Sequence, residues 1–491
     1  MSHLLTSIIF LPLLTAILLG TFRAPIKLLK LGAAFSSLGT IVLVIFLLLH
    51  FNPHQGMQFV QNSPWIYNSG ISYIVGVDYL SLVILSLITL LIPLLYLYMY
   101  KENRKGYWYN MMLLQTGVTG AVLSLDMILF YLFWETMLLP IFIMIGKYGN
   151  GMKQYNSMKI LLMTILGSMS MLFSILYIGY VYFDIHGVWS FALTDLTTLS
   201  FNAKTSIWLA SGFLLAFAIK IPLVGFHTWM APAYGSAPTP AVVILSSIMA
   251  KLGIYGIWRF GFSLFDATLA YYTSTIIVLA LIGLLYYAIR AVTEDNLRKM
   301  FAYSSGSHLS LIALGIFVTN IYAWGGALYL IAAHALASAG IFILIGLTYK
   351  RFATVNISEL GGIASVAPKF AFFFAFFSLS IAGLPGTGGF ISELLIIIGA
   401  FKSNFWIGVF TATTMLAAMT YIFWMLQRTL FSQANNACFE IEDLNTREIL
   451  ILLPLTLLIL LMGIAPSLFT PLVEPGLSRA LENILTQIGG L

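Results

Sequence analysis

Six ionisable side chains stand inside long apolar stretches of this 491-residue sequence, where charge is otherwise rare. They are Glu135, Lys220, Lys251, His308, His334 and Glu393. A charged side chain at the centre of a membrane costs roughly 2.5–3.5 kcal/mol on insertion scales, and residues kept there usually serve ion pathways. Histidine exchanges protons near neutral pH, and buried lysines and carboxylates change their proton affinity with their neighbours. The six residues therefore predict a path for protons.

Each residue taken alone has a structural alternative. An intramembrane glutamate or lysine can form an ion pair that only fixes helix packing. A histidine among small residues, such as His334 in IAAHALASAG, can be a hydrogen-bonded packing residue. Six such groups in separate apolar runs are hard to explain by packing alone. Their types do not match an oxygen cage for calcium or a cysteine and histidine site for zinc, so no metal is expected, although composition leaves sodium open.

The elements that must position these residues are membrane helices. The sequence is 60% hydrophobic and 8% charged, with a mean hydropathy of +0.97, whereas soluble domains carry about 25% charge. The apolar runs are continuous rather than alternating, which excludes a β-barrel. At about 20 residues per span, the pattern predicts an all-α polytopic membrane protein with about fourteen transmembrane helices, at residues 3–21, 29–50, 77–100, 109–125, 127–146, 158–183, 206–226, 239–262, 271–290, 299–318, 322–347, 369–400, 405–427 and 448–469.

Two of these spans are expected to be broken. Pro222 follows Lys220 by two residues and removes a backbone donor, and the segment LPGTGG at 384–389 interrupts the twelfth run. Spans four to eight and nine to thirteen each form a set of five whose fourth helix is the broken one. An odd number of helices per set predicts inverted repeats, as in many transporters. The expected divisions are three N-terminal helices in 1–108, the first half in 109–262, the inverted second half in 263–430, and a polar loop, the last span and a tail in 431–491.

Basic residues are unevenly distributed between the loops. Alternate loops, beginning with the first, hold seventeen lysines and arginines, and the opposite loops hold three. This bias places the first set of loops inside and both termini outside. The first apolar run lacks a basic leader and a small-residue cleavage site, so it is expected to remain as a span. Because the net charge of +6 comes largely from these loops, no nucleic-acid partner is expected.

Several smaller features complete the pattern. Residues 51–76 are expected to form the longest outer loop, and 431–447 a polar inner loop that contains Glu440, Glu442 and Asp443. Asp78 and Asp126 lie at span ends, where a helix start can satisfy a carboxylate, and both are expected to be structural. The single cysteine, Cys438, excludes a disulfide framework or a cysteine-ligated cluster made by this chain alone.

The segments around the six residues resemble a known family. FYLFWETMLLPIFIMIGKYG contains Glu135, FAIKIPLVGFHTWM contains Lys220, and APTPAVVILSSIMAKLGIYGIWR contains Lys251. DNLRKMFAYSSGSHLSLIALG, LYLIAAHALASAGIF and LPGTGGFISELLIIIGAF contain the two histidines and Glu393. From about residue 77 to 469 the chain resembles the antiporter-like membrane chains of proton-pumping NADH:quinone oxidoreductase (respiratory complex I), and chain M, the bacterial counterpart of mitochondrial subunit 4, more than its sisters.

That resemblance implies a function for the site. In the family, the glutamate matching Glu135 pairs with the lysine matching Lys220. The residues matching Lys251, His308 and His334 continue a polar line through the membrane centre, and the one matching Glu393 ends it toward the outside. The chain would be a proton-translocating subunit of an enzyme in a bacterial inner membrane, beside antiporter-like chains L and N. It would hold no redox centre, because NADH, FMN, iron–sulfur clusters and quinone belong to the other subunits.

One segment departs from the family pattern. The family usually reads Leu-Pro-Asp-Ala-His-x-Glu-Ala-Pro-Thr after His-Thr-Trp, whereas here Pro232, Tyr234 and Ser236 replace the aspartate, histidine and glutamate. The contacts at the inner end of the first half are therefore in question. The alternatives are a subunit of a multisubunit sodium/proton antiporter, the membrane arm of a hydrogenase or carbon-uptake complex, and a scaffold that does not conduct.

Overall fold

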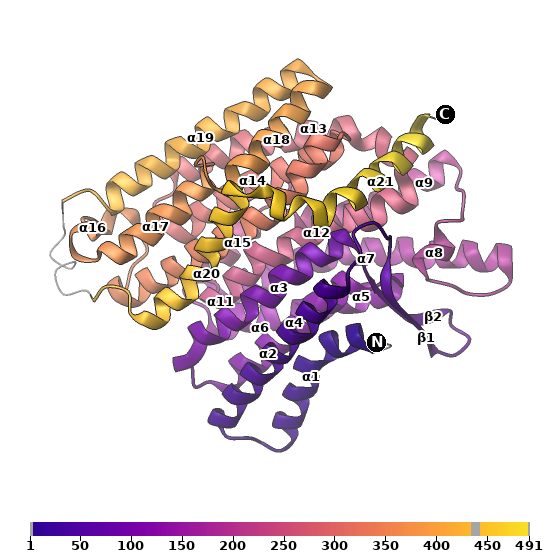
Figure 1. Ribbon diagram of the computed structural model, residues 1–491. Coiled ribbons are helices and arrows are strands. Elements are labelled where there is room, and N and C mark those ends of the chain that lie inside the picture. Colours follow the sequence, from indigo (N-terminus) through magenta and orange to yellow (C-terminus); the bar gives the residue numbers. More distant parts are fainter. Residues whose placement is uncertain (1–2, 434–441, 490–491) are drawn as a thin grey trace.

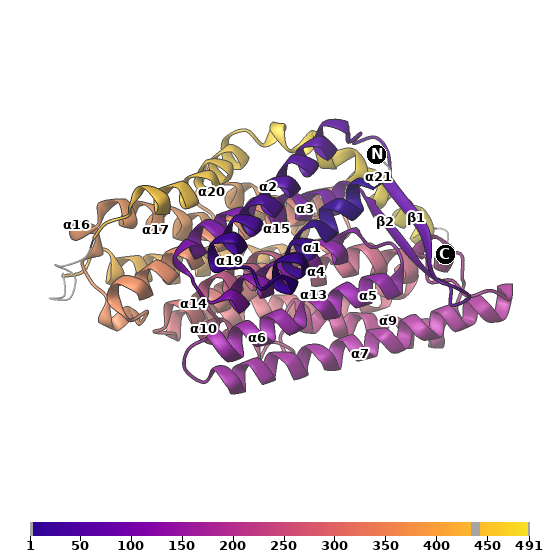
Figure 2. The ribbon, with the colours of Figure 1, turned by 90° about the horizontal axis from the view of Figure 1, so that it is seen from below.

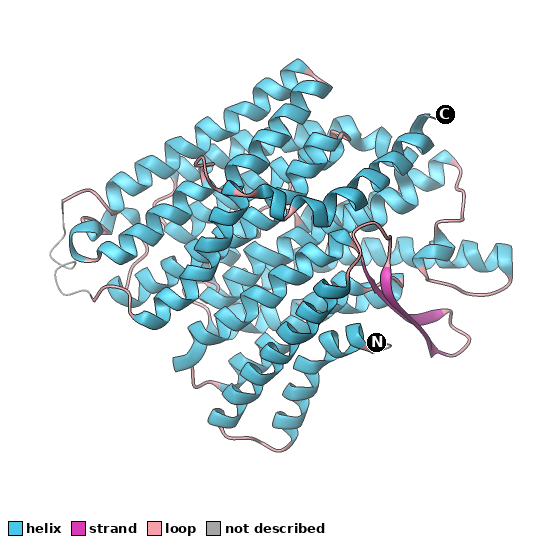
Figure 3. Ribbon diagram, viewed as in Figure 1, coloured by secondary structure: helices cyan, strands magenta, loops and turns pink. Residues whose placement is uncertain are grey.

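The computed structural model describes residues 3–433 and 442–489 and shows a bundle of long helices that run side by side (Figure 1). A two-stranded sheet at one end is the exception to this helical architecture within the described part of the chain (Figure 3). Cys438 and Glu440 lie outside the described residues. The predicted class, a helical polytopic membrane protein, is confirmed.

The first part of the chain runs from α1 to α10. Its helices are α1 (Leu4–Thr21), α2 (Ile26–His50), α3 (Tyr79–Tyr98), α4 (Lys105–Leu123), α5 (Met127–Thr136), α6 (Leu138–Tyr148), α7 (Lys153–His186), α8 (Leu193–Leu196), α9 (Ala203–Lys220) and α10 (Met230–Ser236). The 34-residue α7 extends past the neighbouring helices at one end (Figure 2).

The second part supplies the centre and the far side. Its helices are α11 (Thr239–Ile244), α12 (Ala250–Gly256), α13 (Phe262–Thr293), α14 (Leu297–Phe317), α15 (Ile321–Phe352), α16 (Ile363–Val366), α17 (Pro368–Ile381), α18 (Gly388–Ser403), α19 (Phe405–Thr429), α20 (Thr446–Ile464) and α21 (Thr470–Gly489). The segment 239–265 is buried along its whole apolar window, and α14 and α15 are almost as deeply buried. These three segments are the most deeply buried, and they carry three of the six candidate residues, Lys251, His308 and His334.

Twelve helical segments among the described residues are long and apolar enough to cross a membrane. The other two predicted spans are also helical. In α4, polar residues such as Asn110 and Gln115 lower the mean hydropathy, and the twelfth run is divided into α17 and α18. The observed helices are therefore consistent with fourteen spans.

Both predicted helix breaks are present. The first separates α9 from α10 over residues 221–229, and the second separates α17 from α18 over residues 382–387. A third interruption, which was not predicted, lies between α5 and α6 at Met137. Pro140 explains it, because proline has no N–H to donate to the residue 136 carbonyl and its ring crowds that carbonyl. This interruption begins two residues after Glu135.

The span predicted at 239–262 is not a uniform α-helix. Two π-helical turns, Leu245–Met249 and Ile257–Gly261, flank α12 and its Lys251. A π turn inserts an extra residue into the helix and leaves backbone groups with altered partners, and such turns are frequent at functional sites. The helix continues into α13, which is kinked at Phe265, where the backbone leaves the helical region.

The stretch predicted as a long outer loop contains a hairpin instead. Strands β1 (Gln58–Ile66) and β2 (Ile71–Val77) pair antiparallel, with Gln61 opposite Val75 and Asn62 opposite Ile74. The hairpin takes up Val77, so the following helix α3 begins at Tyr79 with Asp78 as its N-cap. Polar and apolar residues do not alternate clearly in this stretch, and Pro64 argues against a strand. The sequence therefore does not predict a strand pair here.

The C-terminal tail is a helix that was not predicted. Helix α21 contains Pro475, an internal breaker that argues against a helix in sequence. It is fastened to the segment before the hairpin by Arg479, whose guanidinium donates to the carbonyls of Pro53 (3.1 Å), His54 (2.7 Å) and Gln55 (2.8 Å). In Figure 1, α1 begins and α21 ends at the end of the bundle that carries the hairpin. The start of α1 and the end of α21 therefore lie at the same end of the bundle.

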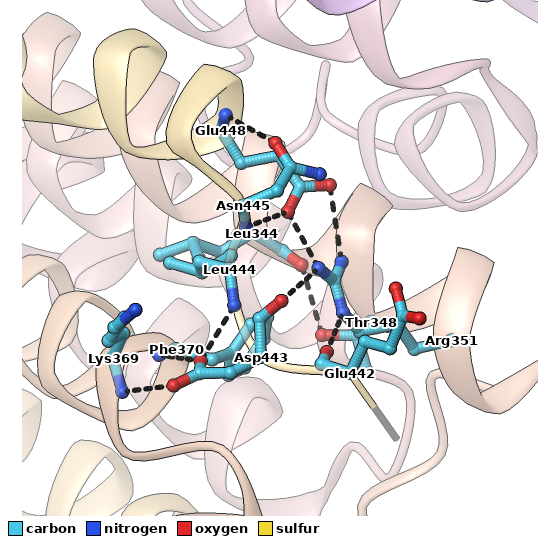
Figure 4. Close-up of polar contacts among 10 residues, drawn as sticks. All are labelled: Leu344, Thr348, Arg351, Lys369, Phe370, Glu442, Asp443, Leu444, Asn445 and Glu448. Carbon is cyan, nitrogen blue, oxygen red and sulfur yellow. Dashed lines mark hydrogen bonds and ion pairs between the residues drawn. The ribbon is translucent and has the colours of Figure 1, made fainter. Parts of the chain in front are cut away.

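The opposite end of the bundle is held by a polar cluster around Arg351, at the end of α15 (Figure 4). Arg351 donates to the Glu448 carboxylate at 2.6 and 3.4 Å and to the Glu442 carbonyl at 2.9 Å. Asp443 accepts from the backbone N–H groups of Lys369 (3.0 Å) and Phe370 (2.9 Å) at the start of α17. This part of the predicted polar loop therefore joins α15, α17 and α20.

Candidate functional site

Four of the six predicted residues form one buried, connected cluster. Lys251, His334, His308 and Glu393 come from α12, α15, α14 and α18, and none is more than 4% exposed. Lys251 Nζ lies 2.8 Å from His334 Nδ1. The rings of His334 and His308 stand 5.1 Å apart between centroids, and His308 Nε2 lies 3.3 Å from Glu393 Oε1. The cluster thus crosses the centre of the bundle without leaving the protein interior.

The π turn before α12 provides one partner of Lys251. The ammonium group donates to the Ser246 carbonyl, which lies in this turn, as well as contacting His334. Since an ammonium group is always a donor, His334 Nδ1 serves as an acceptor while Lys251 is charged. The other ring nitrogen of His334, Nε2, is buried and has no hydrogen-bond partner within the described part of the chain. His334 is therefore held on one side and free to exchange a proton on the other.

His308 is held differently, by acceptors on both sides of its ring. Nδ1 lies 2.8 Å from the Ser304 carbonyl one turn earlier in α14, and Nε2 lies 2.9 Å from the Ile381 carbonyl at the end of α17. A carbonyl only accepts, so both hydrogen bonds form when both nitrogens carry protons. The Glu393 carboxylate beside Nε2 supplies the matching negative charge. This arrangement favours the imidazolium form of His308.

The second helix break positions Glu393. Its carboxylate lies against Gly383, where an added Cβ would stand 3.1 Å from Oε2. Gly383 has φ +77°, a left-handed conformation that glycine adopts without steric cost. The break also leaves the Ile381 carbonyl available for His308. Glu393 Oε1 accepts no hydrogen bond from any described residue, because the nearby N–H of His308 points to that carbonyl.

Glu135 and Lys220 form a second group, which is not joined by direct contact. No ion pair within 4 Å links them among the residues that the structure describes. Lys220 Nζ lies 4.8 Å from the centre of the Trp134 ring, which neighbours Glu135 in sequence. Glu135 Oε1 is buried and accepts no hydrogen bond from the described residues. The Glu135–Lys220 pair that the resemblance implies is therefore not closed as an ion pair among the described residues.

The first helix break is braced around Lys220. Lys220 is the last residue of α9 and is 3% exposed. The Trp229 indole donates to the Ile219 carbonyl at 3.0 Å, and the Tyr287 hydroxyl donates to the Pro222 carbonyl. These bonds satisfy carbonyls that a continuous helix would have paired. The end of α9 is thereby kept in the bundle interior.

Sequence reasoning missed the hydroxyl groups around the cluster. The Ser338 hydroxyl donates to Ser246 Oγ at 2.9 Å, and the Tyr421 hydroxyl lies 2.8 Å from Ser304 Oγ. The serine-rich stretches SSIMAK and AYSSGSH were a signal, since they place hydroxyls within a few residues of Lys251 and His308. Tyr421 gave no such signal, because tyrosine is common in membrane helices.

Comparison with known proteins places the chain in a family. Residues 124–420, more than half of the chain, match the family described as NADH:quinone oxidoreductase/Mrp antiporter, TM. The chain belongs to this family. The predicted resemblance to the antiporter-like family is therefore confirmed.

Relatives in the antiporter-like family match the chain over its whole length. NADH-quinone oxidoreductase subunit M of Rhodobacter capsulatus is 33% identical over 100% of this chain and 99% of its own length. A chain of respiratory complex I from Thermus thermophilus has a TM-score of 0.88 at 28% identity, over 99% of this chain and 100% of that chain. A chain of the Mrp complex from Dietzia sp. DQ12-45-1b has a TM-score of 0.87 at 19% identity, over 99% of both chains, and so shares the fold.

The segment that departs from the antiporter-like family pattern forms α10 and its end. Tyr234 is fully buried against Phe342, with ring centroids 5.7 Å apart, and Ser236 Oγ accepts from Asn156 Nδ2 at 2.6 Å. Nearby, the buried Arg298 donates to the Ala237 carbonyl at 3.2 Å and pairs with no carboxylate among the described residues. The neutral residues Tyr234 and Ser236 are thus packed into the fold. A backbone carbonyl, instead of a carboxylate, accepts the hydrogen bond from Arg298.

Both aspartates predicted to be structural cap helices. Asp78 accepts from the Ser81 N–H in a capping box at the start of α3 and also pairs with Arg259. Asp126 accepts from the N–H groups of Ile128 (2.9 Å) and Leu129 (3.0 Å) at the start of α5. These predictions are confirmed, and the Arg259 partner is an addition.

Proposed function

We propose that this chain is a proton-translocating membrane subunit of an NADH:quinone oxidoreductase. The observation that carries the proposal is the buried series Lys251–His334–His308–Glu393, in which ionisable groups from four helices lie next to one another. Groups of this kind inside a membrane protein usually mark ion or proton routes. The full-length likeness to subunit M at 33% identity supports this enzyme as the parent complex.

Each residue of the site has a role in this proposal. Glu135 and Lys220 form a pair whose separation is adjustable, so that closing it retains the charge on Lys220 and opening it favours release of the lysine proton. Lys251, His308 and His334 relay the proton. Glu393 is the terminal exchange site toward the outside, next to the break between α17 and α18.

The proposal also includes the division and the orientation of the chain. Residues 109–262 and 263–430 act as inverted halves, each with one broken helix, between the helices of 1–108 and the C-terminal part 431–491. The loops with most basic residues face the bacterial cytoplasm, and both termini face the periplasm across the inner membrane. Such halves with breaks at matching positions suit transport through the membrane centre.

Electron transfer takes place in other subunits under this proposal. NADH oxidation by FMN, the iron–sulfur clusters and quinone reduction belong to the rest of the complex, and antiporter-like chains L and N flank this chain. A subunit of a multisubunit sodium/proton antiporter is the second candidate, because the family includes Mrp antiporters. The lower identity to the Mrp chain, 19%, favours the oxidoreductase.

The test of the proposed function is Glu393→Gln in the assembled complex in closed membrane vesicles. The amide keeps the shape but cannot exchange a proton, so we expect proton pumping and coupled quinone reduction to fall by about 10²-fold. Glu474→Gln is the control, since Glu474 is exposed on α21. Pumping and quinone reduction are measured with a pH-sensitive dye and by NADH absorbance. Normal pumping in assembled Glu393→Gln complex contradicts the proposal, and sodium-dependent transport without quinone reduction favours the antiporter.

Gly383→Ala tests whether the break positions Glu393. The new methyl group would stand 3.1 Å from Glu393 Oε2, so we expect the carboxylate to shift from His308 and pumping to decrease. Gly386→Ala is a matched control, because Gly386 also has positive φ (+90°) but its added Cβ meets nothing within 4 Å. In both variants the new alanine has to adopt a left-handed backbone conformation, which destabilises the folded chain by roughly 1–2 kcal/mol. Equal pumping rates in the two assembled variants contradict a positioning role for Gly383.

A further inference from the structure

The ammonium group of Lys251 has two hydrogen-bond partners in the described part of the chain, and helix α15 holds both of them. The first partner is His334 Nδ1, at 2.8 Å, which lies on α15 itself. The second is the backbone carbonyl of Ser246, in the π turn that precedes α12. An ammonium group only donates, so its position follows from where these two acceptors stand.

Ser338, also on α15, holds the residue that supplies the second partner. The Ser338 hydroxyl donates to Ser246 Oγ at 2.9 Å, and both side chains are fully buried. Ser246 Oγ in turn donates to the Val243 carbonyl, 3.4 Å away at the end of α11. Ser246 thus accepts a hydrogen bond from Ser338 on its side chain and one from Lys251 on its carbonyl.

The π turn Leu245–Met249 has no second tie of this kind. Among the described residues, the bond from Ser338 is the only hydrogen bond that this turn receives from outside the segment 239–265. The neighbouring Ser247 hydroxyl is buried and has no hydrogen-bond partner there. The π conformation is rare, and the turn LSSIM contains no proline or glycine that would favour a break. An outside contact is therefore the feature that can hold this turn.

The second π turn, Ile257–Gly261, also has a buried polar contact from outside the segment. Asp78, the N-cap of α3, pairs with Arg259 within that turn. The helix that carries Lys251 is thus fastened on both sides, to α15 before it and to α3 after it. A polar contact with another helix accompanies each of the two departures from α-helical geometry.

The spacing of His334 and Ser338 relates the two partners of Lys251. The two residues are four positions apart on α15, so they lie on the same face of the helix, one turn from each other. His334 contacts the Lys251 side chain, and Ser338 contacts the residue whose carbonyl binds it. A displacement of α15 would therefore change both partners of the ammonium group together.

We propose that Ser338 is a positioning residue for proton transfer between Lys251 and His334. Its bond to Ser246 keeps the carbonyl of that residue at the ammonium group, and this holds Nζ next to His334 Nδ1. Ser338 does not itself exchange a proton with the relay. The inference rests on the proposed function and gives a role to a residue outside the six. A displacement of about 1 Å at a reacting group can lower a rate by about 10²-fold, so a small shift here matters.

Ser338→Ala is the direct test, because it removes the hydroxyl that holds Ser246. In closed vesicles that contain the whole complex, we expect coupled proton pumping to fall by about tenfold. The solvent deuterium isotope effect on that rate should rise, because transfer between Lys251 and His334 becomes limiting. Ser310→Ala is the matched control and should leave both quantities unchanged. Ser310 is buried on α14, and its hydroxyl donates to a carbonyl of its own helix at 2.9 Å.

Ser246→Ala is the second variant, and it decides the matter if Ser338→Ala fails to assemble. It removes the acceptor of the same bond but keeps the carbonyl that binds Lys251, so the same changes in rate and isotope effect are expected. The double variant should be no slower than either single one, since both changes remove one bond. Multiplicative losses would show that the two serines act separately, and would overturn the positioning role.

Two further outcomes overturn the inference. One is a normal pumping rate with a normal isotope effect in assembled Ser338→Ala complex. The other is a slower rate with an unchanged isotope effect, because a packing defect then explains the loss. If Glu393→Gln abolishes pumping in the same assay, the proposed function stands and this inference alone fails. If Glu393→Gln also pumps normally, the proposed function fails as well.

Discussion

Lys251→Met is expected to abolish most proton pumping while the complex still assembles. The ammonium group is fully buried and contacts the Ser246 carbonyl and His334 Nδ1, so its loss removes the link between the first half and the histidines. Loss of a group that transfers protons commonly lowers rates by about 10²–10⁴-fold, and we expect a decrease in this range. Methionine fills a similar volume without charge, which limits the structural damage. Pumping is measured in closed vesicles, with NADH oxidation in the same sample.

Lys204→Met is the control for this variant. Lys204 is exposed in the first turn of α9, the helix that ends at Lys220. It should leave pumping unchanged. A near-normal ratio of protons to electrons in assembled Lys251→Met complex contradicts the relay role. If the variant complex does not assemble, Lys251→Gln retains a donor to Ser246 without an exchangeable charge, and the same loss is expected.

Glu135→Gln and Lys220→Ala are expected to give the second large effect, and to give it as a unit. Each should reduce pumping and coupled quinone reduction by about 10²-fold, and the double variant should be no worse than either single one. The reason is that each partner acts through the other. The absence of a direct ion pair between the two described side chains further predicts that neither change greatly lowers stability.

Two measurements separate these expectations. Pumping in closed vesicles reports the functional coupling, and thermal dissociation of the detergent-solubilised complex reports stability. Independent, multiplicative losses of pumping in the double variant would show that Glu135 and Lys220 act at separate steps. A large loss of stability with unchanged pumping would show that they serve packing.

The sequence located the six candidate residues because a charged or titratable residue in an apolar run is conspicuous. It also located both breaks, since Pro222 and the glycines after Leu384 cannot continue a helix. The division into the Glu135–Lys220 pair and the line from Lys251 to Glu393 came from the family resemblance and not from the residue pattern, because contact across helices depends on the rotation of each helix about its axis. The π turns around Lys251 alter that rotation and have no sequence signature in the apolar pattern.

The parts that were missed have ordinary compositions. Tyr421 is one aromatic residue among many, and only its position opposite Ser304 distinguishes it. The β1–β2 stretch lacks a clear alternation of polar and apolar residues and contains Pro64, and α21 contains a proline as well. In each case the surrounding structure, rather than local preference, determines the conformation: Arg479, for example, fastens α21 to the carbonyls at 53–55.

The two π turns have a geometric consequence for the residue between them. Each turn accommodates one surplus residue, so side chains beyond it point about 100° away from where an uninterrupted helix would direct them. One π turn precedes α12 and another follows it. The direction in which Lys251 points around the helix axis is therefore set independently of α11 and α13. Deleting a single residue from Leu245–Met249 would swing the ammonium group away from His334 without shortening the hydrophobic length by more than about 1.5 Å.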